Sequence, residues 1–238
     1  MSASPPTTDD LLAAAQNGDA SAAAALYEQV AADAHRVAAT LTGGRRAADA
    51  VIRTLAKQAA DVLPRWRSGD EATRWFVHHM IILTRQHPPR PAKEVDVLLD
   101  GVGGPDVVQY TAIVEAIRKL PAQQREAVLL THARRWNPRL CAVAMDCSTA
   151  AVDTHLAEGE RQLRPLAGAA FGPLMEYLHR VHKSYALQLP YSPANFAGRV
   201  RRRHWGGSLK QVVAWSLIAL VVVGAVLFFV VVLPRIET

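Results

Sequence analysis

Cysteine is scarce in this chain, and the common catalytic signatures are absent. Only Cys141 and Cys147 occur among 238 residues, and their spacing fits neither a metal site nor a disulfide framework. Such usage is typical of a reducing cytoplasm. The sequence also contains no HExxH, no Walker-type loop and no Gly-x-Ser-x-Gly. We therefore expect that the protein is not an enzyme and that it needs no metal and no cofactor.

Alternation of apolar and polar residues, the mark of a half-buried strand, is also missing, whereas helix-forming residues and alanine abound. We predict an all-α fold with two small helical domains at 10–87 and 107–167. A short disordered lead at 1–9 precedes them, and a Pro-, Gly- and Asp-rich linker at 88–106 joins them. Asp19 is expected to cap one helix, and Gly43 to end it.

One long hydrophobic run stands out at 213–233. It contains 21 residues without a charge, of which 15 are Leu, Ile, Val or Phe. A helix of that length spans about 31 Å, close to the ~30 Å hydrocarbon core of a bilayer. The alternative, a buried core helix, is usually shorter and amphipathic. We predict a transmembrane helix at 213–233 and a short external tail at 234–238.

The charge of the chain is concentrated beside that run. Residues 1–170 hold 19 basic and 19 acidic residues, whereas residues 171–238 hold 8 and 2, which is the entire net charge of +6. Basic residues before the span place the N-terminal side in the cytoplasm, and no signal peptide precedes it. We predict a flexible basic juxtamembrane tether at 191–212 that faces anionic lipid headgroups. Its membrane-surface residues are Arg199, Arg201, Arg202, Arg203 and Lys210.

Two helices joined by a tight turn occupy the end of the second domain. Asn137–Pro138 begins the first of them, Asp146–Cys147 makes the turn, and Ser148 caps the second. This is the pattern of a helix-turn-helix. An amphipathic helix is expected within 168–190, and it either docks on the preceding domain or lies on the membrane surface.

Four segments occur in an order and at spacings typical of one family: DLLAAAQNGDASAAAALYEQV, LPRWRSGDEATRWFVHHMI, IRKLPAQQREAVLLTHA and MDCSTAAVDTHLAEGERQLRPL. Through them the chain from 10 to 166 resembles a bacterial extracytoplasmic-function sigma factor, the smallest class of RNA polymerase specificity subunit. The resemblance implies that the first domain, similar to the second conserved region, binds the polymerase clamp and opens −10 DNA. The second domain, similar to the fourth region, would place a helix in the −35 major groove. The resemblance implies RNA polymerase core and promoter DNA as partners, and an anti-sigma factor or a protease as a possible further partner. Membrane lipids are expected as partners at the inner membrane.

DNA contacts are implied for two segments. In the first domain, Trp75 would stack on an unpaired base while neighbouring cations approach phosphates, although Trp75 and Phe76 fit a hydrophobic core equally well. The candidates there are Arg65, Arg67, Arg74, Trp75 and His78. In the recognition helix the candidates are Thr149, Thr154, His155, Arg161 and Arg164.

The chain departs from the family at both partner surfaces. At the clamp-binding positions only Asp49 keeps its charge, beside Val51 and Ile52, and Arg53 replaces a glutamine. Losing carboxylates and gaining a cation weakens a surface built to bind a basic or mixed partner. The recognition helix is acidic where relatives are basic, which opposes phosphate contacts. Its departing positions are Asp153, His155, Glu158 and Glu160.

Two hypotheses follow from this mixture. In the first, the protein is a membrane-tethered sigma factor that directs RNA polymerase to promoters. In the second, it is a sigma-derived, membrane-anchored interaction or regulatory module that has lost promoter recognition. The order of the sigma-like segments favours the first, and the altered charges favour the second. A small enzyme has no residue constellation in its support.

Overall fold

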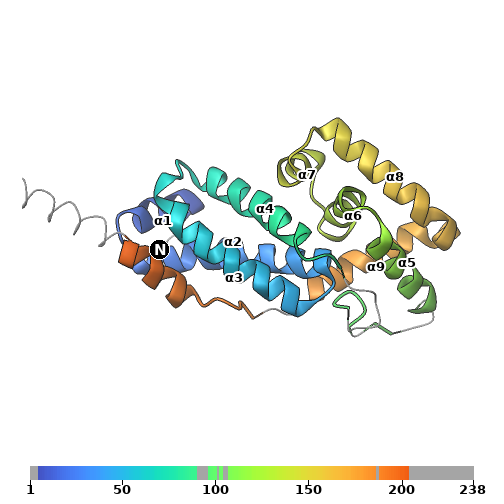
Figure 1. Ribbon diagram of the computed structural model, residues 1–238, viewed down its shortest axis with the longest axis horizontal. Helices are drawn as coiled ribbons and strands as arrows, with labels where there is room; N and C mark the ends of the chain where they lie inside the picture. The colour runs from blue at the N-terminus through green and yellow to red at the C-terminus, as the bar shows by residue number, and fades with distance from the viewer. Residues whose placement is uncertain (1–4, 90–95, 101, 104–106, 186–187, 204–238) are drawn as a thin grey trace, which may run out of the picture.

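The computed structural model describes residues 5–89, 96–100, 102–103, 107–185 and 188–203, and every regular element within them is helical (Figure 1). This agrees with the all-α class predicted from the sequence. Within the same residues, no helix is both long enough and apolar enough to cross a membrane. The transmembrane helix predicted at 213–233 lies outside the described residues, as do the tail at 234–238 and Lys210.

The first helical unit consists of α1 (Thr8–Gln16), α2 (Ala20–Thr42), α3 (Arg45–Val62) and α4 (Gly69–Arg85), with a 3-10 turn at Leu63–Arg65. Local caps set their ends. The Asp19 side chain accepts from two backbone amides at the start of α2, and Gly43 ends that helix with a φ of 74°. Glycine adopts that left-handed conformation without strain, and the helix ends at Gly43 as the sequence predicted. The apolar sides of the helices meet in a core that includes Leu26, Leu55 and Met80.

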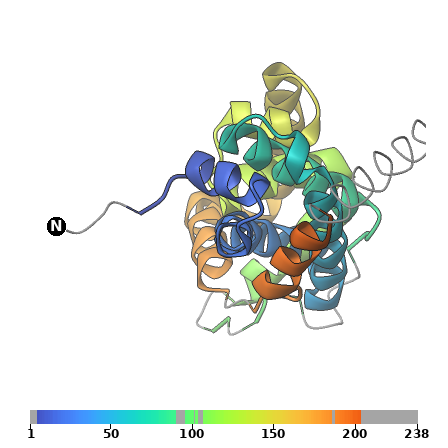
Figure 2. The same ribbon diagram turned by 90° about the vertical axis from the view of Figure 1, so that its left-hand side faces the viewer.

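The second unit consists of α5 (Val107–Lys119), α6 (Ala122–Val128), α7 (Pro138–Met145) and α8 (Thr149–Ala167), with a π-helical turn at Leu129–Ala133 after α6. Asn137 caps α7 by accepting from the Leu140 amide at 2.9 Å. Asp146 takes a left-handed φ of 57°, and Ser148 then caps α8. The predicted turn between two helices is therefore present, with α7 and α8 on the side of the molecule away from α3 (Figures 1 and 2).

The amphipathic helix is α9 (Phe171–Ser184), and it docks on the protein. Its apolar stripe, which includes Leu174, Met175 and Leu178, is buried against the second unit and α2. At its far end, His182 Nδ1 is hydrogen-bonded to Thr40 Oγ1 of α2 at 2.7 Å. Of the two placements that periodicity allowed for this segment, the structure has the docked one.

The flexible tether predicted at 191–212 is wrong in its first half, because residues 193–203 are helical. Phe196, Ala197 and Val200 form a buried apolar face on this C-terminal helix. The Phe196 ring stacks on Tyr27 of α2 with centroids 4.7 Å apart. The prediction rested on the proline, glycine and arginine content of this segment and overlooked its apolar face of three residues. That face orders the segment because it packs against α2 and α3.

The linker predicted at 88–106 is also more than a spacer where it is described. Asp96, Val97 and Leu98 are buried, and the Val97 amide donates to the carbonyl of Gly43 at 3.0 Å. This short segment fills the junction between the end of α2 and the second unit. The two units therefore pack directly on one another and are not joined only by a flexible linker.

Candidate nucleic-acid and polymerase interface

The recognition helix α8 presents its N-terminal part to solvent. Thr149, Asp153 and Thr154 are exposed, and His155 is half-buried. The Thr154 hydroxyl donates to the carbonyl of Ala150 at 2.9 Å, within its own helix. A helix with an open first turn behind a helix-turn-helix corner has the geometry that enters a major groove.

Both arginines of α8 are held by acids of the same helix. Arg161 donates to Glu158 through Nε and Nη2, and this hydrogen bonding lowers the pKa of the Glu158 carboxyl. Arg164 pairs with Glu160. Burial tends to raise the pKa of Glu160, but hydrogen bonds from Arg164 and His132 bring it below its ordinary value. The arginines predicted to contact DNA are thus neutralised within α8, and Asp153 adds a further negative charge.

Gly159 is unfavourable for helix formation, but it is needed for the packing of α8. A Cβ at this position would lie 2.7 Å from Cγ2 of Val128, so α6 and α8 cross where only glycine fits. Glycine inside a helix costs ~1 kcal/mol of helix stability, and here that cost accompanies the close approach of α6 and α8 that glycine permits. The core of the helix-turn-helix therefore fixes the position of α8.

The candidates on and before α4 differ in their exposure. Arg65 and Arg67 are exposed, and Arg74 pairs with Asp70 at 2.9 Å. Trp75 is half-buried, with its ring stacked on His79 at 4.0 Å.

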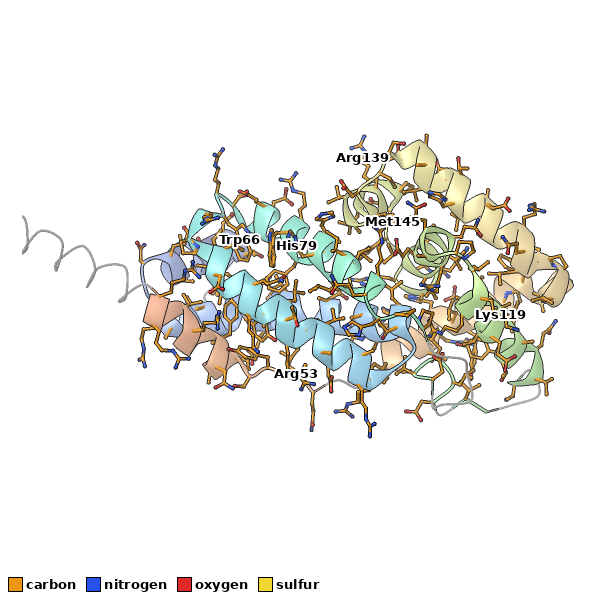
Figure 3. The ribbon with its side chains drawn as sticks, viewed as in Figure 1. Arg53, Trp66, His79, Lys119, Arg139 and Met145 are labelled. Carbon is orange, nitrogen blue, oxygen red and sulfur yellow. The ribbon has the colours of Figure 1, made fainter. Side chains whose placement is uncertain are left out.

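Of the two aromatics that fitted either DNA or a core, Phe76 is a core residue, 2% exposed. Trp75 keeps part of its surface open, and His78 beside it is half-buried. Figure 3 shows Trp66 and His79 on the same side of α4, where both adjoin Trp75 in an aromatic group.

Burial contradicts two of the three polymerase contacts predicted on α3. Val51 and Ile52 are each 1% exposed and belong to the hydrophobic core, so they are not available to a partner. Alignment to a motif gave their position along the chain but not the face of the helix on which they lie. Asp49 is half-buried and hydrogen-bonded to the buried His35 at 2.8 Å. Burial lowers the pKa of His35 despite the opposing influence of Asp49.

Two ion pairs join the two helical units directly, and a third joins the linker to the second unit. Arg85 of α4 reaches both carboxylate oxygens of Glu126 in α6, at 2.8 and 2.7 Å. Arg134 pairs with Asp33 of α2 at 2.7 Å.

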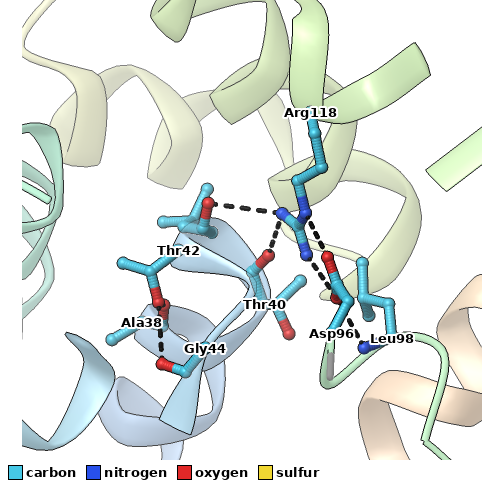
Figure 4. Close-up of polar contacts among 8 residues, drawn as sticks. Ala38, Thr40, Thr42, Gly44, Asp96, Leu98 and Arg118 are labelled. Carbon is cyan, nitrogen blue, oxygen red and sulfur yellow. Dashed lines mark hydrogen bonds and ion pairs between the residues drawn. The ribbon is translucent and has the colours of Figure 1, made fainter. Parts of the chain in front are cut away.

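The third pair is the most deeply buried. Arg118 of α5 bonds both oxygens of Asp96, and its Nη1 donates to the carbonyl of Thr40 at 2.6 Å (Figure 4). The Arg118 side chain thereby satisfies carbonyls at the end of α2 that no helical partner reaches.

Sequence reasoning missed these interdomain residues. One signal was available, since Arg118 follows Ile113, Val114 and Ile117 on the apolar face of its helix. A cation among core positions needs a buried acid, but the sequence does not say which acid.

The arginines predicted to lie at the membrane surface divide into two kinds. Arg199 and Arg203 both pair with Asp61 of α3, at 3.0 and 2.6 Å. Their hydrogen bonds lower the pKa of the Asp61 carboxyl. Arg201 and Arg202 are exposed. In the described part of the chain, no three His, Cys, Asp or Glu side chains gather as a metal site would require.

Comparison with known proteins assigns the second unit. Residues 110–163 match the family model described as Sigma-70, region 4. No curated protein and no solved structure matches the chain. The matched range begins in α5, includes α6 and α7, and ends in α8, so it contains the whole helix-turn-helix. Residues 110–163 of this protein are therefore similar to region 4 of sigma-70 factors, a match that suggests a sigma-factor-like role in transcription.

Proposed function

We propose that this protein is a membrane-tethered sigma factor of the extracytoplasmic-function type, which directs RNA polymerase core to promoters. The observation that carries the proposal is the region 4 match over residues 110–163 together with the exposed N-terminal part of α8. A helix-turn-helix of this kind reads DNA by inserting its second helix in the major groove. Sigma-70 region 4 implies polymerase core and promoter DNA as partners.

The first helical unit supports the same function through its resemblance to the second conserved region. Arg65 and Arg67 are exposed on either side of Trp66 in the chain, and the Trp66 ring packs against the partly open Trp75. Proteins bind single-stranded DNA with cations that contact its phosphate backbone and with aromatic side chains on which its bases stack. We propose that this surface contacts opened −10 DNA.

The membrane part of the proposal rests on the sequence. The uncharged run at 213–233 is long enough to span a bilayer, and all of the net positive charge lies in residues 171–238. We propose a single-pass protein of the inner membrane with its N-terminal part in the cytoplasm. The tether then limits how much of the sigma-like portion reaches the nucleoid. An anti-sigma factor or a protease would change that amount.

A second function is favoured by the charges of α8. Arg161 and Arg164 are engaged by Glu158 and Glu160, and Asp153 faces solvent among them. A surface of this kind repels phosphates and releases few counterions. This supports the alternative, in which the chain is a sigma-derived, membrane-anchored regulatory module without promoter recognition.

Association with polymerase separates the two functions. The full chain, purified in detergent, is mixed with RNA polymerase core at low and at high salt and followed by size-exclusion chromatography. A stoichiometric complex is expected for a sigma factor. Absence of a complex even at low salt overturns the sigma-factor proposal and leaves the regulatory module. A complex that does not shift promoter DNA assigns the chain to polymerase regulation without promoter recognition.

A further inference from the structure

The outward side of α3 carries a stripe of cations. Arg46, Arg53 and Lys57 are spaced by seven and four residues, which places them within about 40° of one another around a helix. All three are exposed. Figure 3 shows Arg53 pointing away from the protein on the side of α3 that is remote from Arg139. Among the described residues, no acidic side chain forms an ion pair with any of the three.

The C-terminal helix extends this stripe. Its Arg199 and Arg203 clamp Asp61, the acidic residue at the end of α3. Asp61 is thereby neutralised, and Arg201 and Arg202 remain exposed on the same helix. The other acid near the stripe, Asp49, is half-buried against His35. Three exposed cations on α3 and two on the C-terminal helix are thus linked through Asp61, and the carboxylates of Asp61 and Asp49 are already engaged.

We propose that this α3 basic face, made of Arg46, Arg53, Lys57, Arg201 and Arg202, docks on the anionic headgroups of the bilayer. The described part of the C-terminal helix reaches residue 203, and the predicted span begins at residue 213. The ten peptide steps between them reach at most about 35 Å. The face is therefore confined near the membrane by its own chain, where each basic residue favours an anionic surface by roughly fivefold. The inference rests on the membrane tether of the proposed function but not on promoter recognition.

Lipid docking has a consequence for polymerase. The resemblance places the clamp contacts at residues 49–54 of α3, which is the helix that would lie on the bilayer. Lipid and polymerase then compete for one side of α3, whereas α8 on the opposite side stays open (Figures 1 and 2). The membrane would thus withhold the first unit from polymerase even while the helix-turn-helix remains exposed.

The test uses the full chain in nanodiscs. In a Cys147→Ser background, in which Cys141 is buried, a fluorophore is placed by Thr54→Cys beside the stripe. Lipids with a headgroup quencher report its distance from the bilayer. Discs rich in phosphatidylglycerol should quench the probe several-fold more than discs of phosphatidylcholine. High salt should remove the difference, because the Debye length falls to about 3 Å at 1 M.

Matched charge removals decide whether the stripe is responsible. The triple variant Arg46→Gln, Arg53→Gln and Lys57→Gln should lower the ratio of docked to undocked chains by roughly a hundredfold. The control Arg67→Gln, Lys119→Gln and Arg139→Gln removes three exposed cations elsewhere and should leave quenching unchanged. All six residues are exposed, and unchanged thermal unfolding would show that both variants fold.

The outcomes separate this inference from the tether itself. A chain that stays with both discs but shows equal quenching in them contradicts lipid docking and leaves the tether intact. Equal loss in the two triple variants also contradicts it, because the attraction would then be unspecific. If promoter DNA or polymerase core shields the probe but lipid does not, the face belongs to that partner. A chain that does not stay with either disc overturns the tether and this inference together.

Discussion

Arg118 holds Asp96 through two parallel hydrogen bonds, Nε to Oδ2 at 2.7 Å and Nη2 to Oδ1 at 2.9 Å. Both side chains are 3% exposed. The same guanidinium donates to the carbonyls of Thr40 and Leu41, so one side chain ties the linker, α2 and α5 together. A Cβ on Gly43 would lie 2.9 Å from Asp96 Oδ2, which leaves no room for another residue at this corner. The relative placement of the two helical units depends on this contact.

Replacing Arg118 by methionine should strongly destabilise the protein. Removing one partner of a buried pair leaves the other charge uncompensated, which costs about 3–5 kcal/mol. Urea unfolding followed by tryptophan fluorescence measures the loss. Lys119→Met, on an exposed neighbour, should change the free energy of unfolding by less than about 0.5 kcal/mol. The double variant Arg118→Met with Asp96→Asn should cost less than the sum of its single changes, and strict additivity would show that the pair does not interact.

Gly159→Ala should destabilise the region 4 domain although alanine is the better helix former. The new methyl group would meet Val128 at 2.7 Å, and overpacking of this kind typically costs about 1–3 kcal/mol. Val128→Ala in the same chain should recover part of the loss. Gly172→Ala in α9 is the matched control, because its Cβ would meet nothing within 4 Å. That variant should be neutral or stabilised by up to about 1 kcal/mol. A stabilised Gly159→Ala chain would refute the close crossing.

Charge reversal on α8 should strengthen DNA binding if that helix approaches a duplex. Asp153→Lys and Glu158→Lys remove two repulsions, and the second also frees Arg161 from its partner. Affinity for duplex DNA, measured by fluorescence anisotropy, should rise more than tenfold at low salt. The slope of log affinity against log salt should steepen by about 0.9 for each new phosphate contact. Glu115→Lys, an exposed reversal on α5, should have a smaller effect. Equal effects would show that α8 does not face DNA.

Acidification should weaken the contact between α9 and α2 through His182. Burial, reinforced by Arg36 and Arg134, lowers the pKa of His182 to about 3, whereas the unfolded chain protonates near its ordinary 6.5. The unfolded state therefore binds more protons below pH 6.5, and stability falls from there down to about pH 3. The loss from this group alone is about 2 kcal/mol at pH 5. His182→Gln should flatten the curve of urea midpoint against pH, and an unchanged curve would exclude His182 as its source.

Local signals were sufficient for much of the fold. The end of α2 at Gly43 and the starts of α7 and α8 follow from caps that are adjacent in sequence to the helices they bound. The docking of α9 was one of two placements that periodicity allowed, because a hydrophobic stripe does not specify its partner.

The site was predicted less well, for reasons of distance and orientation. Val51 and Ile52 were placed at a partner surface from motif position, but the turn of the helix directs them into the core. Arg118 and Asp96 are 22 residues apart on either side of a Pro- and Gly-rich stretch, and only the packed chain brings them together. The internal pairing of Arg161 with Glu158 required side-chain geometry.

The most direct test of a sigma-factor function is promoter-directed transcription in vitro. RNA polymerase core is incubated with the full chain and a library of genomic fragments from the same cell, and transcript 5′ ends are mapped. A sigma factor should yield discrete start sites that are absent with core alone and that weaken when Arg65 and Arg67 are changed to alanine. If core with and without the chain gives the same start sites, although the chain is folded and binds core, the protein does not direct initiation and the proposed function is wrong.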